Sequence, residues 1–301
     1  MIRAKQLSDG MTCGPLQAKV WVDVETPTPE EVETVKQQFA INPLALADAQ
    51  EIGHWSRFEQ YPQHLFLILR TLESPAASTS RTERVSFFFF PETQTLLTYR
   101  NEHVEYLEQA WNSFRGGSCI WLWQRLLDHG VETFFDYVEN LIDRVEDLEE
   151  TALEGTEATT PKQVFAIRRE VLRVRRLVSQ GREALLHLER LPVLGADAYM
   201  FRDLTDRMGR VYEGLDAARD ELSNVLEVYL SAQSNKLNRI VQNLTVISVL
   251  FLPMTLWAGI YGTNFETFNE YGWAYGRWFF WGGLVAIGVG LALWMKRQKW
   301  W

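Results

Sequence analysis

The first 130 residues mix two hydrophobic patterns, one typical of strands and one typical of helices. Four segments rich in β-branched and aromatic residues predict strands, namely AKVWVDVE, HLFLILRTL, RVSFFFF and QTLLTYR. Between the first two, TPEEVETVKQQF opens with Thr28, Pro29 and Glu31, the pattern of a capping box at the start of a helix. Residues 1–130 are therefore expected to form an α/β domain.

From Val131 onwards, apolar residues recur every three or four positions, which is the helical period. One stripe covers residues 138–152 and a second covers residues 164–178, with Pro161 between them. The pattern predicts an antiparallel helical hairpin over residues 131–196.

The two helices of this hairpin differ in charge. The first carries Glu146, Asp147, Glu149 and Glu150, and the second carries Arg168, Arg169, Arg173, Arg175 and Arg176. Opposite charges are therefore expected to face each other across the hairpin as weak surface pairs.

The most regular apolar stripe runs from Phe201 to Tyr229, and no proline interrupts it before the apolar run that follows. It predicts one helix over residues 197–262, on the order of 95 Å long, that leads from a soluble body across a membrane. Because one helix cannot bury such a seam alone, we expect copies to associate around a central axis. A bundle of this kind inside a membrane is a candidate pore.

Two uncharged runs, residues 240–265 and residues 278–295, are each long enough to cross a bilayer as a helix. The connecting loop, residues 263–277, is acidic, with Glu266 and Glu270. The tail after the second run, residues 296–301, is basic, with Lys296, Arg297 and Lys299. By the positive-inside rule both termini are expected in the cytoplasm and the loop outside. The first residues contain no apolar signal-peptide segment, so no cleavable signal is expected.

Composition narrows the function classes. The chain has 30 basic and 39 acidic residues, a net charge of -9, which argues against nucleic acid as a partner. Its two cysteines, Cys13 and Cys119, lie far apart and predict neither a zinc module nor a disulfide framework. The five histidines have no ligand spacing, and no nucleophile motif or phosphate loop is present. We therefore expect neither an enzyme nor an organic cofactor.

Polar and small residues form a stripe along the first apolar run. They are Asn238, Gln242 or Asn243, Thr245, Ser248, Thr255 and Gly259. Unsatisfied polar groups are costly in lipid, so this stripe should face protein or water. Helix packing through small residues and hydroxyl groups is the alternative to a water-filled pore.

The segment LTVISVLFLPMTLWAGIYGTNFE, the acidic loop, the second run and the ending MKRQKWW together resemble the membrane hairpin of the CorA family of divalent metal ion transporters. Further stretches, including NPLALADAQE, IRREVLRVRR and LEVYLSAQSNKLN, resemble the family in the same order, so the likeness covers nearly the whole chain. The resemblance implies an α+β fold: a cytoplasmic α/β domain, long coiled-coil-like helices and a two-helix transmembrane hairpin, assembled as a pentameric funnel. The expected location is a bacterial inner membrane.

The resemblance also implies a pore. Gly262, Thr263 and Asn264 would stand at its outer mouth, where five Asn264 amides hold a hydrated cation and Glu266 and Glu270 attract it. The implied pore-lining residues are Asn238, Val241, Leu244, Thr245, Ser248, Leu252, Thr255 and Gly259. Leu244 and Leu252 would form hydrophobic constrictions, and Asn238 a polar ring at the cytoplasmic end.

Two departures from the family pattern leave the transported ion open. Thr263 stands where the commonest signature has methionine and the zinc-transporting branch has isoleucine. Asp203 matches a position that regulated members use to sense magnesium, but the loop ESPAASTS offers only Glu73 as its partner, so weak regulation is expected. Three hypotheses follow: a channel for magnesium, cobalt or nickel, a zinc transporter with or without proton coupling, and a membrane scaffold that conducts nothing.

Overall fold

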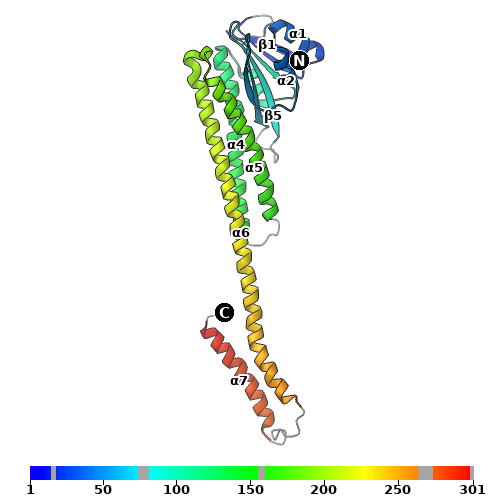
Figure 1. The fold of residues 1–301 in the computed structure, drawn as a ribbon, viewed down its shortest axis with the longest axis vertical. Coiled ribbons are helices and arrows are strands. Elements are labelled where there is room, and N and C mark those ends of the chain that lie inside the picture. The colour runs from blue at the N-terminus through cyan, green and yellow to red at the C-terminus, as the bar shows by residue number, and fades with distance from the viewer. Residues whose placement is uncertain (15–17, 74–80, 155–159, 264–273, 299–301) are drawn as a thin grey trace. The chain divides into compact units, whose positions relative to one another are not determined.

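The computed structural model describes residues 1–14, 18–73, 81–154, 160–263 and 274–298 (Figure 1). The chain divides into two compact units, one formed mainly by residues up to Leu226 and one formed mainly by residues from Glu227 onwards. Each unit is described by itself below.

The first unit contains a six-stranded sheet of mixed direction, as the α/β prediction requires. Its strands are β1 (Ile2–Gln6), β2 (Val20–Glu25), β3 (Arg57–Gln60), β4 (Leu65–Leu72), β5 (Thr82–Phe90) and β6 (Thr95–Arg100). They lie in the order β1-β2-β6-β5-β4-β3, and every neighbouring pair is antiparallel except β2 and β6. The four predicted strands are confirmed as β2, β4, β5 and β6, whereas β1 and β3 were not predicted.

Both faces of this sheet are covered, which explains its uninterrupted apolar runs. On one face, α1 (Pro29–Phe39) and α2 (Pro43–Gln50) pack against side chains such as Phe66 and Phe88. On the other face, Trp21 contacts Trp111 of α3 (Glu105–Ser113), with ring centroids 4.9 Å apart. The capping box of α1 is confirmed, since Thr28 and Glu31 each bond to the other's backbone N–H.

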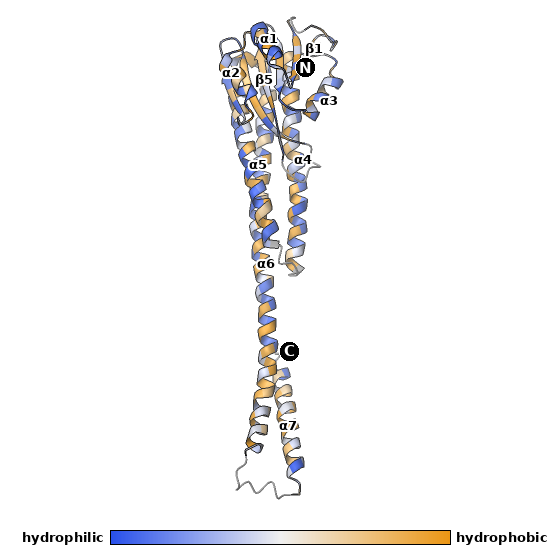
Figure 2. Ribbon diagram, turned by 90° about the vertical axis from the view of Figure 1, so that its right-hand side faces the viewer, coloured by the Kyte–Doolittle hydropathy of each residue, from blue (hydrophilic) through white to orange (hydrophobic). Residues whose placement is uncertain are grey.

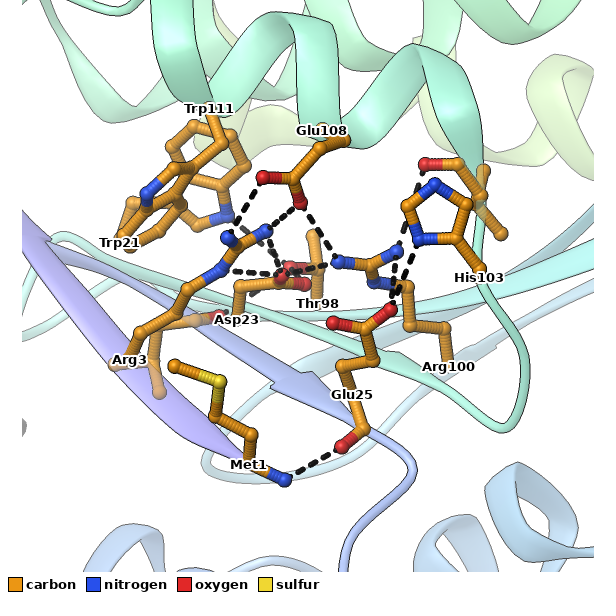
Figure 3. Close-up of polar contacts among 12 residues, drawn as sticks. Met1, Arg3, Trp21, Asp23, Glu25, Thr98, Arg100, His103, Glu108 and Trp111 are labelled. Carbon is orange, nitrogen blue, oxygen red and sulfur yellow. Dashed lines mark hydrogen bonds and ion pairs between the residues drawn. The ribbon is translucent and has the colours of Figure 1, made fainter.

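A buried ion cluster joins three strands to α3 (Figure 3). The Asp23 carboxylate accepts hydrogen bonds from Arg3 at 2.9 Å, from Arg100 at 2.9 Å and from the Thr98 hydroxyl at 2.7 Å. Arg3 also pairs with Glu108 of α3 at 2.5 Å, and this bond lowers the pKa of the Glu108 carboxyl. The Asp23 side chain is 1% exposed and that of Arg100 is 0% exposed, so their charges compensate each other out of reach of water.

Three helices complete the first unit: α4 (Cys119–Glu154), α5 (Thr160–Glu189) and the first part of α6 (Ala198–Tyr261). Helix α4 begins upstream of the predicted division near residue 130 and packs on the sheet, with Trp123 stacked on Phe89 at 5.0 Å. The expected helical hairpin is formed by α4 and α5.

The apolar seam of α6 is buried within one chain, which corrects the expectation that other copies cover it. Phe201 contacts Trp123 of α4, and Met208 packs against Gly181 of α5. The buried positions continue to Val225. The seam therefore belongs to a three-helix bundle in which α4 and α5 supply the apolar partners.

The expected charge pairing across the hairpin is also corrected. Among the described residues, the ion pair that joins α4 to α5 is formed by Arg144 and Glu170 at 3.0 Å. Its basic member comes from α4, the helix that was expected to supply the acidic members. On α5, the arginine-rich helix, Arg175 forms an ion pair with Asp216 of α6 at 2.8 Å. Glu146, Asp147 and Glu150 are exposed instead.

The second unit contains the rest of α6 and the helix α7 (Gly276–Arg297). Both helices are long and apolar enough to cross a membrane. Figure 2 shows hydrophobic residues along α7 and along the C-terminal part of α6.

Candidate functional site

The C-terminal part of α6 exposes large apolar side chains in the single chain. Leu244 is 63% exposed and Leu252 is 75% exposed. In the most apolar stretch of this helix, no side chain is buried by the part of the chain that the structure describes. Such a surface requires lipid or other copies of the chain to cover it.

Helix α7 covers one side of this part of α6. The Trp257 indole N–H donates to the Phe280 carbonyl at 3.2 Å, and the Trp257 ring also contacts Tyr261 and Phe279. A Cβ atom on Gly283 would lie 2.6 Å from the Trp257 ring, so glycine is required there for the two helices to approach. Met254 lies beside Gly288 of α7, at a distance that leaves room for an ordinary contact. Met254 and Trp257 therefore lie on the side of α6 that faces α7.

The eight residues expected to line a pore lie on a different side of α6. At about 100° per residue, the positions from Asn238 to Gly259 fall within about one third of the helix circumference. That stripe lies roughly half a turn away from Met254 and Trp257. The position of α7 therefore leaves the predicted stripe uncovered within the part of the chain that the structure describes.

The hydroxyl groups on this stripe are satisfied by the helix itself. Thr245, Ser248 and Thr255 each donate to the carbonyl oxygen four residues earlier, at 2.8 Å. This bond uses the hydroxyl hydrogen, so only the oxygen lone pairs remain for a ligand. Oxygen acceptors of this kind suit a cation or the hydrogens of its hydration water.

At its C-terminal end, α6 closes with a turn at Gly262 and Thr263. The Gly262 N–H donates to the Ala258 carbonyl at 3.0 Å, and the Thr263 hydroxyl donates to the Ile260 carbonyl at 2.7 Å. Thr263 therefore caps the helix, a role that sequence reasoning missed because it depends on the path of the backbone. Asn264, Glu266, Glu270 and Lys299 lie outside the described residues, while Lys296 and Arg297 are exposed in the last turn of α7.

Residues 17–297 match the family described as CorA-like Mg2+ transporter protein. The chain belongs to this family. It is therefore a membrane protein that transports divalent metal ions, and not an enzyme. The family assignment also confirms the resemblance noted from the sequence.

Two curated relatives and one solved structure show how far the similarity to other CorA-like proteins extends. The chain is 28% identical over 281 residues to the cobalt/magnesium transport protein CorA of Thermotoga maritima, covering 89% of this chain and 79% of that protein. It is 26% identical over 289 residues to the putative metal ion transporter YfjQ of Bacillus subtilis, covering 93% and 89%. The complete structure of the CorA magnesium transporter from Methanocaldococcus jannaschii superposes with a TM-score of 0.84 at 19% identity, over 100% of this chain and 99% of that one. This structural match confirms the fold.

Within one chain, the two residues expected to bind a regulatory magnesium ion do not lie together. Asp203 is exposed on α6 and Glu73 is exposed after β4, and no contact joins them. Among the described residues, no group of three or more histidine, cysteine or acidic side chains could hold a metal ion. One helical turn beyond Asp203, Arg207 pairs with Asp128 and Glu132 of α4, an arrangement that the sequence did not reveal.

The surroundings of Glu73 are strongly acidic. Burial, followed by the negative charges of Glu73 and Glu102, raises the pKa of the half-buried Glu83 carboxyl to about 7. Glu83 lines a hollow of about 240 Å³ together with Glu105 and Asp136. Protonation of Glu83 relieves the repulsion between these carboxylates without a cation.

Proposed function

We propose that this CorA-family chain forms a homopentameric channel for magnesium, cobalt or nickel ions, in which the stripe from Asn238 to Gly259 on α6 lines the pore. The observation that carries this proposal is that α7 packs on the opposite side of α6 and leaves the stripe uncovered. The resemblance to the family supports five copies, and the relative from T. maritima bears the name of a cobalt/magnesium transport protein.

The chemistry of the proposed pore fits an ion that keeps its water. Magnesium releases its hydration shell reluctantly, so neutral oxygens that bind the shell attract the ion without trapping it. Thr245, Ser248 and Thr255 supply such oxygens along the stripe, and Asn264 is proposed to supply five amide oxygens at the outer mouth. Leu244 and Leu252 are proposed as hydrophobic constrictions between the polar levels, where gating takes place by exclusion of water.

The experiment that tests this function is metal flux into liposomes that contain the purified protein. Magnesium, cobalt, nickel and zinc are compared, each with and without a pH gradient. Flux of magnesium, cobalt and nickel without a pH gradient is expected. Zinc flux that depends on a proton gradient would contradict the proposal and indicate a zinc transporter, the alternative that the unusual Thr263 favours. Absence of flux for every metal would indicate a membrane scaffold that conducts nothing.

The orientation of the membrane hairpin gives a further prediction. Because Lys296 and Arg297 end α7 while the loop between the spans is acidic, the loop should lie outside and the C-terminus in the cytoplasm. A cysteine at Asn269 should therefore react with an impermeant thiol reagent added to intact cells, whereas a cysteine at Gln298 should react only after lysis. The reverse labelling pattern would contradict this topology.

Regulation by cytoplasmic magnesium is predicted to be weak. Because Asp203 has no acidic cluster beside it among the described residues, Asp203→Ala should leave magnesium protection against proteolysis nearly unchanged, with a difference below about twofold. The measurement is the rate of limited proteolysis of the full chain with and without magnesium. Asp206→Ala, another exposed acid on α6, is the matched control. A large loss of protection in Asp203→Ala alone would show a regulatory ion at this position.

A further inference from the structure

Four basic side chains lie at the end of the second unit where the apolar run of α6 begins and that of α7 ends. Arg239 directly precedes the apolar run of α6, and Lys236 lies one residue short of a turn before it. Lys296 and Arg297 belong to the last turn of α7. All four side chains are exposed, and among the described residues none of them forms an ion pair or a hydrogen bond. These four residues form the basic band, whose charges are available to a partner outside the chain.

The sequence supplies no acidic residue to neutralise the basic band. Residues 228–265 and residues 271–301 contain no aspartate or glutamate, although the whole chain has a net charge of -9. The basic band therefore concentrates positive charge in an otherwise acidic protein. A partner that compensates this charge has to be negatively charged.

The two bases of α6 lie on the side of that helix which α7 covers further along. Lys236 stands eighteen residues before Met254, a residue that contacts α7. Arg239 stands eighteen residues before Trp257, the other residue that contacts α7. Eighteen residues make about five full turns of an α-helix, so each base points in the same direction as its counterpart. Both bases therefore point away from the stripe proposed to line the pore.

Helix α7 ends before it reaches these two bases. Met254 lies beside Gly288, and α7 continues for nine residues from Gly288 to Arg297. Because α7 is antiparallel to α6, Arg297 stands at about the level of Thr245, nine residues before Met254. Arg239 lies six residues beyond that level, about 9 Å further along the helix axis. Within the described residues, α7 therefore leaves the two bases of α6 uncovered.

The level of the basic band matches the headgroup layer of a membrane. The apolar run of α6 begins at Ile240, directly after Arg239. Near the end of α7, Trp294 is 49% exposed, and tryptophan is a residue type that gathers at membrane interfaces. The headgroup layer extends about 5–8 Å beyond the hydrocarbon on each side, and the long side chains of lysine and arginine add to the depth that the band can reach.

We infer that the basic band binds the headgroups of anionic phospholipids in the cytoplasmic leaflet, on the outward side of α6 and beside the end of α7. The leaflet and the outward direction rest on the proposed orientation and the proposed channel, which puts the opposite side of α6 at the axis. A lipid fits better than a soluble anion, because the band adjoins apolar helix surfaces that contact acyl chains. Bases in this position attract anionic lipid without placing positive charge in the path of a cation.

The test is the preference of the full-length protein for anionic over neutral phospholipid. Purified protein in detergent is mixed with equal amounts of phosphatidylglycerol and phosphatidylcholine with the same acyl chains, and the lipids that stay bound are counted by native mass spectrometry. Wild-type protein should retain phosphatidylglycerol in at least about fivefold excess. Lys236→Gln with Arg239→Gln should reduce this excess at least about threefold, because two of the four bases are removed. Equal retention of the two lipids by wild-type protein would overturn the inference.

Two control variants separate the position of the bases from the net charge of the protein. Arg202→Gln with Arg210→Gln removes the same charge from exposed positions of α6 in the first unit and should leave the lipid preference unchanged. The exchange Lys236→Leu with Leu237→Lys keeps the net charge but turns one base about 100° toward the stripe, and it should lower the preference. An equal fall in the Arg202 and Arg210 variant would show an effect of net charge alone and overturn the inference.

Two further measurements separate this inference from its alternatives. An excess of inorganic phosphate should leave phosphatidylglycerol bound, and its displacement would show a site for a free anion in place of a lipid. Metal flux is then measured in vesicles of phosphatidylcholine with and without phosphatidylglycerol. Flux by a protein that shows no lipid preference would overturn the lipid site and leave the proposed channel standing. Lipid preference in a protein that conducts nothing would overturn the channel and, with it, the outward direction assigned to the band.

Discussion

Replacement of Asn264 with alanine is expected to abolish most metal uptake while the pentamer persists. In the proposed pore, five amide oxygens at the outer mouth accept hydrogen bonds from the water bound to an incoming cation. A hydrogen bond to a charged partner contributes about 1.5–3 kcal/mol. Loss of these bonds should therefore reduce flux by roughly tenfold or more, since each 1.4 kcal/mol corresponds to about a factor of ten.

Neighbouring groups cannot replace the Asn264 amide. The Thr263 hydroxyl donates to the Ile260 carbonyl and caps α6, which keeps it turned toward its own helix. The pentamer should survive because α6 ends at Tyr261, so Asn264 is not part of the helix whose uncovered stripe is proposed to face the other copies. The assembly therefore does not require the Asn264 side chain.

The measurement is metal uptake by liposomes that contain equal amounts of wild-type and Asn264→Ala protein, with oligomeric state checked by size-exclusion chromatography. Asn269→Ala, which removes the other amide of the same loop, is the matched control and should retain uptake. Wild-type uptake by Asn264→Ala pentamers would eliminate the amide ring as the site that receives the ion.

The sequence predicted the central strands of the sheet and missed its two edges, for a physical reason. Strands β4 and β5 are covered on both faces, and their apolar runs are visible in the sequence. Strands β1 and β3 lie at the edges, where IRAKQ and RFEQ carry the charged residues typical of edge strands and give no apolar run. Edge pairing depends on partners that only the three-dimensional structure shows.

The same limit explains the misassigned seam of α6. An apolar stripe indicates that something covers a helix, but it does not distinguish the same chain from another copy. The stripe at Phe201 proved to be covered by α4 and α5, whereas the polar stripe beginning at Asn238 stays uncovered. Residue spacing was enough to group the eight predicted pore residues on one side of α6. The packing of α7 was needed to show which side is available to other copies.

The ion cluster around Asp23 was missed because it joins residues as distant in sequence as Arg3 and Glu108.

The burial of this cluster leads to the second prediction with a large expected effect. Asp23→Ala should lower the free energy of unfolding of the first unit by about 3–5 kcal/mol. Removal of the Asp23 carboxylate leaves the fully buried Arg100 guanidinium without its shortest ion pair. It leaves the Thr98 hydroxyl with only the more distant Val22 carbonyl, at 3.4 Å, as acceptor. Loss of compensation for a buried charge costs far more than the loss of a surface ion pair.

The measurement is thermal unfolding of the full chain in detergent, followed by tryptophan fluorescence, to which Trp21 and Trp111 beside the cluster contribute. A decrease in the melting temperature of roughly 10 °C is expected for Asp23→Ala. Glu108→Ala, at a position that is 31% exposed, should cause a smaller decrease. The double variant Asp23→Ala with Arg100→Met should recover part of the loss, because it removes the buried charge that Asp23→Ala deprives of its shortest ion pair and leaves with Glu25 and Glu108. A double variant no more stable than Asp23→Ala alone would show that packing around Asp23, and not charge compensation, stabilises this part of the sheet.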